Sequence, residues 1–221
     1  MKLLLNALAK YVLGLLLVGL LVFLPAGTLN YTGGILFLSL LFIPILILGV
    51  VLFLKAPELL QKRLNNKETE STQKTVVALS ALVFISGFIV AGLDFRFGWS
   101  SLPTAVTVIA SVLFIAAYAL YAEVMRENAY LSRTIKVEEN QKVIDTGLYG
   151  VIRHPMYSAT VLLFLMIPLI LGSLLAFIIF LFYPILIAVR IKNEEKVLTE
   201  QLPGYREYKK KVRFRLIPFI W

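Results

Sequence analysis

Residues 156–190 read MYSATVLLFLMIPLILGSLLAFIIFLFYPILIAVR, and none of these side chains is charged until Arg190. A single helix of that length would measure about 50 Å, whereas the hydrocarbon core of a bilayer is about 30 Å thick. Pro168 and Gly172 offer a break in the middle of the run. We therefore predict a helix–turn–helix hairpin in a membrane, with both open ends on the same side. Its arms are expected near residues 156–170 and 173–190.

The composition is also that of an integral membrane protein. The chain has 221 residues, of which 59% are hydrophobic and 16% are charged, whereas soluble domains carry roughly 25% charged residues. It has no cysteine and a single histidine, which argues against a disulfide framework and against a metal site. Basic residues that flank membrane helices explain the net charge of +9 better than nucleic-acid binding does.

Four further apolar runs precede the hairpin, and each has about the length needed to cross a bilayer, ~20 residues. They cover residues 8–24, 35–54, 76–93 and 102–122. The first could be mistaken for a signal peptide, but Lys10 interrupts it and Pro25-Ala-Gly-Thr28 is a poor cleavage site. Pro44 predicts a kink in the second run. We predict an all-α, polytopic bundle of about six spans, divided into four N-terminal spans (1–122) and a catalytic region (123–221).

Polar connectors separate these runs and set the expected topology. Residues 55–75 form a charged loop with one helical turn at Glu58–Arg63, and residues 94–99 form a short turn with boundary aromatics. If both termini are cytoplasmic, 21 of the 22 Lys and Arg residues lie on the cytoplasmic side, and Arg96 is the exception. The positive-inside rule therefore predicts this orientation, in the cell membrane of a prokaryote or the endoplasmic reticulum of a eukaryote.

The only histidine lies where the last polar segment meets the hairpin, in Gly147-Leu-Tyr-Gly-Val-Ile-Arg153-His154-Pro155-Met156-Tyr157. Proline disfavours helical geometry in the residue before it and suits the first position of a helix. Arg153 and His154 are therefore expected at the mouth of a helix, where free N–H groups favour an anion.

The tail that follows the hairpin supplies a second polar group. Arg190 and Glu194 are four residues apart on a predicted helix, where they form either a surface ion pair or a polar wall that faces His154. Pro203-Gly204 ends that helix, and a second helix follows. By itself, the basic cluster at residues 209–215 fits an amphipathic helix on an anionic leaflet.

These residues carry a resemblance. The pattern Gly147-x-Tyr149-x-x-x-Arg153-His154-Pro155-x-Tyr157, followed by a hairpin, Glu194-Glu195-x-x-Leu198, Gly204-x-x-x-Tyr208 and Arg215-x-x-Pro218, resembles the isoprenylcysteine carboxyl methyltransferase family. The similarity covers about residues 120–218, and the first four spans match only in hydropathy. Related membrane phospholipid methyltransferases share the pattern, and membrane sterol and steroid reductases have a similar C-terminal layout but use NADPH.

The resemblance implies S-adenosyl-L-methionine (SAM) as cofactor, bound between the hairpin mouth and the C-terminal segment, with S-adenosyl-L-homocysteine (SAH) as product. The implied cofactor-binding residues are Tyr149, Arg153, His154, Pro155, Met156, Tyr157, Glu194, Glu195, Tyr205 and Tyr208. Of these, His154 and the N–H groups after Pro155 would meet the cofactor carboxylate, with hydroxyls from Tyr149 or Tyr157. Glu194 or Glu195 would take the ammonium or ribose, and Tyr205 and Tyr208 would cover the adenine.

Two further features bear on the cofactor and the acceptor. The sequence has no glycine-rich strand–helix fingerprint, which excludes the soluble nucleotide-binding arrangement. Asn128 resembles the family's loop asparagine and is a candidate for substrate binding, although Glu127 stands where the family often has glycine.

Methyl transfer to a carboxylate needs alignment and exclusion of water rather than a general base, because a carboxylate is already ionised near pH 7. Arg190 is the candidate that orients an acceptor carboxylate, and Glu194 is the second catalytic candidate. The expected function is SAM-dependent methylation of a lipophilic acceptor, foremost the carboxylate of a prenylcysteine-like or other isoprenoid or lipid molecule. The alternatives are a phospholipid N-methyltransferase and an NADPH-dependent reductase. A transporter or scaffold ranks last, because residues 35–54, 76–93 and 157–189 contain no acidic or basic side chain.

Overall fold

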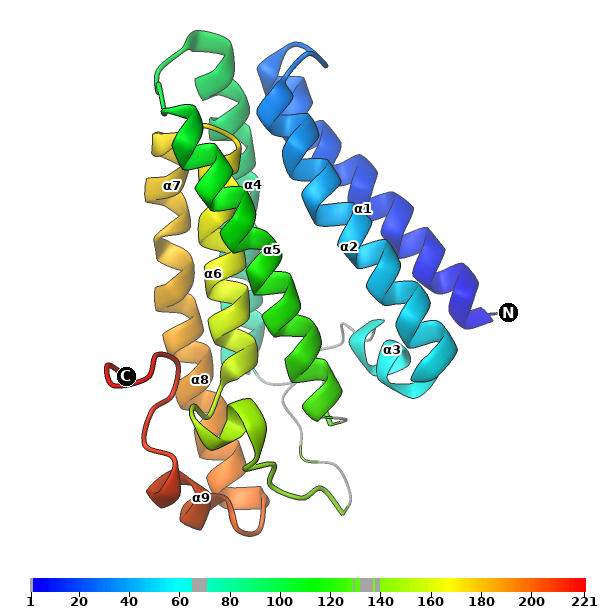
Figure 1. The fold of residues 1–221 in the computed structure, drawn as a ribbon, viewed down its shortest axis with the longest axis vertical. Helices are drawn as coiled ribbons and strands as arrows, with labels where there is room; N and C mark the ends of the chain where they lie inside the picture. The colour runs from blue at the N-terminus through cyan, green and yellow to red at the C-terminus, as the bar shows by residue number, and fades with distance from the viewer. Residues whose placement is uncertain (1, 65–70, 129, 132–136, 138–139) are drawn as a thin grey trace.

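The computed structural model describes residues 2–64, 71–128, 130–131, 137 and 140–221, and the regular structure in these ranges is entirely helical (Figure 1). The helices are α1 (Lys2–Ala26), α2 (Thr32–Lys55), α3 (Pro57–Leu64), α4 (Ser71–Phe97), α5 (Thr104–Glu127), α6 (Pro155–Ile170), α7 (Leu174–Phe180), α8 (Phe182–Gln201) and α9 (Tyr205–Lys211), with a 3₁₀ turn η1 (Gly147–Gly150). The predicted all-α, polytopic membrane bundle is confirmed.

Five stretches are long and apolar enough to cross a membrane: α1, α2, α4, α5 and the combined α7–α8 unit. The sixth expected crossing, α6, is apolar but has only 16 residues, a length of about 24 Å. The hairpin itself forms as predicted. Gly172 adopts a left-handed conformation (φ 76°) in the turn, and the Ser173 side chain caps α7 by accepting the Ala176 N–H at 3.0 Å.

The end of α4, which packs against the hairpin turn, differs from the prediction. Residues 94–99 were expected to form a short turn, but α4 continues to Phe97, and the Asp94 side chain is only 2% exposed. Its carboxylate accepts hydrogen bonds from the Ser173 hydroxyl (2.5 Å) and from the N–H (2.6 Å) and hydroxyl (2.7 Å) of Ser100. Asp94 therefore fastens α4 to the hairpin turn, which explains how a buried carboxylate is tolerated there.

Two other boundaries differ from the sequence-based expectation. The first span begins at Lys2 rather than near residue 8, because Asn6 and Lys10 are compatible with an α-helix although they lower the hydropathy. The helical turn expected at Glu58–Arg63 is the two-turn helix α3. The charged connector continues through residues 65–70, which lie outside the described residues.

The helices pack around α4, which contacts α1, α7 and α8, while α5 packs along α6. Helices α1 and α2 run side by side and diverge from the others toward the end that carries α3 (Figure 1). An aromatic cluster fills the core, with Phe84 in edge contact with Phe164 (4.7 Å between centroids) and Phe180 (5.4 Å). The end of the bundle that carries α3, η1 and α9 is called the site end below.

Close contact between α4 and α7 depends on Gly87, because a Cβ there would stand 2.3 Å from Cε2 of Phe180. Phe180 is fully buried against Phe84 and Phe88, so its ring cannot swing away. We expect Gly87→Ala to lower the free energy of unfolding by about 1–3 kcal/mol, measured as a lower melting temperature in detergent. In α2, Gly49→Ala is the matched control, since no atom lies within 4 Å of the added carbon; equal losses in both variants would contradict the prediction.

Candidate functional site

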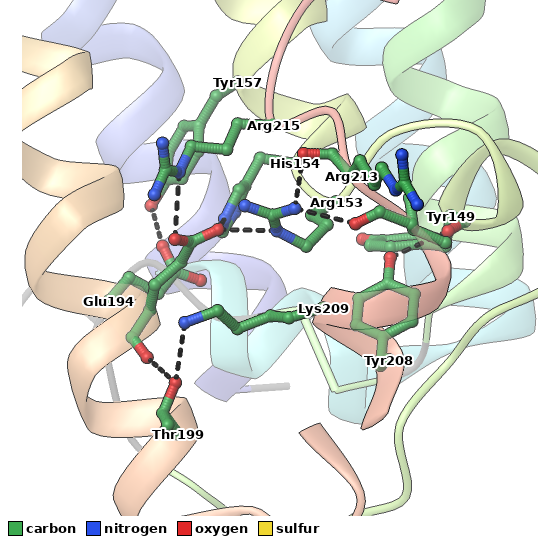
Figure 2. A network of polar contacts seen from close by, with 12 residues as sticks. Tyr149, Arg153, His154, Tyr157, Glu194, Thr199, Tyr208, Lys209, Arg213 and Arg215 are labelled. Carbon is green, nitrogen blue, oxygen red and sulfur yellow. Dashed lines mark hydrogen bonds and ion pairs between the residues drawn. The ribbon is translucent and has the colours of Figure 1, made fainter. Parts of the chain in front are cut away.

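A cluster of charged side chains stands at the site end, centred on the buried Glu195 of α8. Figure 2 shows its partners Arg153, His154 and Arg215. Arg153 Nε donates to Glu195 Oε1 at 2.6 Å, and Arg215 Nε donates to Oε2 at 2.9 Å. His154 Nε2 lies 3.4 Å from Oε1. Glu195, Arg153 and His154 are all less than a tenth exposed, at 4%, 7% and 6%. A carboxylate this deeply buried is stable only because both of its oxygens are bonded to cations.

The same arginine and histidine also bind the backbone of the tail (Figure 2). Arg153 Nη1 donates to the carbonyls of Val212 and Arg213, both at 2.7 Å. The backbone N–H groups of Arg153 and His154 donate to the carbonyls of Phe214 and Arg215, both at 2.9 Å. The Arg-His-Pro motif is therefore a clamp that holds residues 212–215 against the start of α6.

The backbone at the motif is as the sequence predicts. His154 is non-helical (φ −129°, ψ 59°), and Pro155 is the first residue of α6. The backbone N–H of His154 itself is bonded to the Arg215 carbonyl. The tail occupies that part of the helix mouth.

A pocket lies beside this cluster, between the hairpin, η1 and the C-terminal segment. Of the site residues predicted from the sequence, those that line it are Asn128, Tyr149, Arg153, His154, Met156, Tyr157, Arg190, Glu194, Tyr205 and Tyr208. Pro155 and Glu195 do not line it. Sequence reasoning did not assign a role to the lining residues Tyr130, Leu131, Gln141, Lys142, Val143, Ile144, Leu198 and Leu202.

The two adjacent glutamates, which the sequence does not distinguish, have different surroundings. The Glu195 carboxylate is bonded to Arg153 and Arg215, whereas Glu194 is part of the pocket wall. Tyr157 donates its hydroxyl to Glu194 Oε2 at 2.5 Å and accepts from Arg190 Nε at 2.9 Å. Arg190 and Glu194 thus form a polar wall through a bridging tyrosine.

The opposite wall is ordered by η1. The Asn128 side-chain amide donates to the Tyr149 hydroxyl at 3.0 Å, and the Tyr208 hydroxyl donates to the Tyr149 carbonyl at 2.7 Å. Burial raises the pKa of Tyr149 and of Tyr208, so both hydroxyls stay protonated at neutral pH. Two of the predicted residues are therefore held by each other rather than by a ligand.

Glu127 has a structural function at the start of η1. Its carboxylate accepts the Leu148 N–H at 3.1 and 3.3 Å, and so caps the start of η1. Gly147 has a left-handed conformation (φ 51°), and a Cβ at this position would stand 1.6 Å from Glu127 Oε1. Glu127 and Gly147 therefore fit each other at this corner.

Tyr205 differs from its neighbours because its hydroxyl has no hydrogen-bond partner among the described residues. The side chain is 4% exposed and lines the pocket. Burial raises its pKa, and the nearby charges of Glu195 and Glu194 raise it further, so the hydroxyl remains a neutral donor. Leaving a buried hydroxyl unpaired costs about 1–3 kcal/mol. An orphan donor that lines a pocket is available to an acceptor atom of a bound molecule or to a water.

The free volume of the pocket is about 110 Å³, smaller than the roughly 300–1,000 Å³ of typical small-molecule sites. A ligand the size of a nucleoside derivative would therefore have to widen it. The wall at residues 141–144 has no regular secondary structure, so it can move without breaking a helix. No group of three or more histidine, cysteine, aspartate or glutamate side chains in the described part of the chain could hold a metal ion.

Comparison with known families agrees with the resemblance seen in the sequence. Residues 106–200 match the model of the Isoprenylcysteine carboxyl methyltransferase (ICMT) family, a match that runs from α5 to the end of α8. The family is one of membrane methyltransferases, and the match therefore supports an enzyme of this class. None of the curated proteins compared with the chain matches it. The segment that contains Tyr205, Tyr208 and Arg215 follows the matched region.

The different surroundings of the two glutamates predict opposite results for the same substitution. We expect Glu195→Gln to lower the free energy of unfolding by about 3–5 kcal/mol, because it leaves the buried Arg153 and the partly exposed Arg215 without a counter-charge. We expect Glu194→Gln to change it by less than about 1 kcal/mol, since the amide oxygen still accepts from Tyr157. Melting temperatures in detergent measure both. Equal destabilisation by the two variants would show that Glu195 is not the structural tie.

Proposed function

We propose, from the match of residues 106–200 to the isoprenylcysteine carboxyl methyltransferase family and from the pocket beside Glu195, that this protein is a SAM-dependent methyltransferase of lipophilic acceptors. Five helices are long and apolar enough to cross a membrane. Contact with the bilayer therefore belongs to the proposed function. The excess of basic residues at the site end supports a cytoplasmic active site, with both termini on that side. Residues 123–221 form the catalytic region.

The observation that carries the proposal is the unpaired, buried hydroxyl of Tyr205. It lies in a pocket that is lined by both acidic and basic side chains. SAM has a carboxylate, an ammonium, a ribose diol and an adenine, so it needs donors, acceptors and apolar cover together. Glu194 suits the ammonium or the ribose, and the Tyr205 hydroxyl suits an acceptor atom. Leu198 and Leu202 provide apolar walls for the adenine. These residue types fit the cofactor.

The contacts within the protein narrow the roles that the sequence left open. Glu195 already bonds Arg153 and Arg215, so Glu194 is the glutamate that faces the cofactor. The His154 N–H holds the tail, so it is not one of the groups that meet the cofactor carboxylate. The pairing of Tyr208 with Tyr149 leaves Tyr205 as the tyrosine with a hydroxyl to offer.

When bound, SAM supplies an electrophilic methyl group on its sulfonium. Arg190 then binds the acceptor carboxylate, because a guanidinium holds a carboxylate in a fixed, bidentate geometry. Tyr157 holds both Arg190 and Glu194 in the pocket wall. An ionised carboxylate needs no general base, so orientation and exclusion of water are the protein's contributions.

Titration with SAH tests whether the pocket binds this cofactor. Two tyrosines of α9, Tyr205 and Tyr208, supply the variant and its control. We expect wild-type protein in detergent to bind SAH, and Tyr205→Phe to weaken binding about tenfold because one hydrogen bond in a buried site is lost. The same variant should melt at an equal or higher temperature, since the hydroxyl has no partner in the protein.

The matched control is Tyr208→Phe, which removes a hydroxyl that is bonded to the Tyr149 carbonyl. It should lower the stability by about 1 kcal/mol and change SAH affinity less than Tyr205→Phe does. Binding of NADPH in place of SAH would overturn the proposal in favour of a reductase. Equal affinity of wild type and Tyr205→Phe for SAH would show that the Tyr205 hydroxyl does not bind the cofactor.

The acceptor is tested with a prenylcysteine that carries a free carboxylate, by following the transfer of labelled methyl groups. We expect Arg190→Lys to raise KM for this acceptor about tenfold to a hundredfold, because a bidentate charged contact becomes a single one, and to leave SAH affinity unchanged. The methyl ester of the same compound is the negative control. Transfer to an amine phospholipid but not to the prenylcysteine would assign the alternative acceptor class.

A further inference from the structure

A second hollow lies on another face of α8 and is lined by basic side chains. Its volume is about 420 Å³. Its cationic lining residues are Lys192, Lys196, Arg206, Lys209 and Arg215. The two carboxylates that line it are Glu200 and Glu195, and Glu195 is already bonded to Arg153 and Arg215. This basic groove shares no lining residue with the pocket that contains Tyr205.

Three of these cations have no counter-charge among the residues that the structure describes. Lys192, Lys196 and Arg206 make no hydrogen bond or ion pair with any described residue. In contrast, Lys209 reaches the Thr199 hydroxyl at 3.4 Å, and Arg215 bonds Glu195. Cations gathered in a concave site attract an anion, and a phosphate group offers several acceptor oxygens at once.

The groove adjoins apolar surface along α8. Residues 185, 189, 192 and 196 follow one another at spacings of four, three and four, so they lie on one face of the helix. Ile185 and Val189 on this face are 59% and 43% exposed. Apolar surface therefore passes directly into the groove at Lys192.

The tail adds membrane-compatible side chains beside the same groove. The Trp221 ring lies 5.3 Å from the guanidinium of Arg215, and tryptophan is typical of membrane interfaces. Phe219 and Ile220 are 88% and 77% exposed. A soluble protein rarely presents such side chains together, but a bilayer surface can cover them.

We propose that the basic groove binds the phosphate-bearing headgroup of an anionic phospholipid, with the acyl chains along the face of α8 that carries Ile185 and Val189. The charge of the groove selects the headgroup, and the adjoining apolar face selects a lipid over a soluble phosphate. The site is independent of the methyl acceptor, because the groove and the pocket lie on different faces of α8. It holds whether or not the pocket binds SAM.

Native mass spectrometry of the full-length protein, purified in detergent with equal phosphatidylglycerol and phosphatidylcholine, tests the proposal. We expect the wild type to retain phosphatidylglycerol preferentially. We expect the combined variant Lys192→Gln, Lys196→Gln and Arg206→Gln to retain at least about tenfold less, because each basic residue near the surface contributes to anionic lipid binding. The control variant Lys55→Gln, Lys74→Gln and Lys210→Gln removes the same charge outside the groove and should retain the lipid as the wild type does.

Three results would overturn the proposal. Equal losses in both combined variants would show that only net charge matters. Equal retention in all three proteins, with unchanged melting temperatures, would show that the groove is not the lipid site. Finally, glycerol 3-phosphate is titrated without lipid: binding to the wild type that matches phosphatidylglycerol in affinity would assign the groove to a soluble phosphate compound.

Discussion

The buried carboxylate of Glu195 is the interaction on which the site end depends. It joins three segments that are far apart in the chain, the start of α6 through Arg153 and His154, α8 itself, and the tail through Arg215. Removing charged groups from water costs several kcal/mol per ion, and only a fully bonded arrangement compensates for this. The carboxylate and its partners therefore form together or not at all, and the pocket wall depends on them.

The hairpin was predictable because its determinants are local. An apolar run too long for one crossing must turn, and Pro168, Gly172 and Ser173 mark the place. The geometry at His154 was predictable for the same reason, since Pro155 alone restricts it. By contrast, the prediction for the end of α4 was wrong, because the helix continues to Phe97. The local pattern of residues 94–99 suggested a turn, whereas Ser173, which bonds Asp94 and holds it in the interior, lies 79 residues further on.

Within the site, the sequence named most of the lining residues but not their roles. Adjacent residues on a helix point about 100° apart, so only the packing of α8 decides that Glu195 turns to the arginines and Glu194 to the pocket. Tyr205 and Tyr208 look equivalent in sequence, yet one hydroxyl is bonded to the Tyr149 carbonyl and the other has no partner. The wall at residues 141–144 had no periodicity or motif to reveal it.

The position of α8 makes one helix serve two surfaces. Its pocket face carries Arg190 and Glu194, its groove face carries Lys192 and Lys196, and Glu195 fixes the tail between them. The tail in turn supplies Tyr205 to the pocket and Arg215 to the groove, although it follows the region that matches the family model. The matched region therefore does not build either surface alone. Because the pocket is complete only when the tail is docked, binding of the proposed cofactor depends on the docking of that segment.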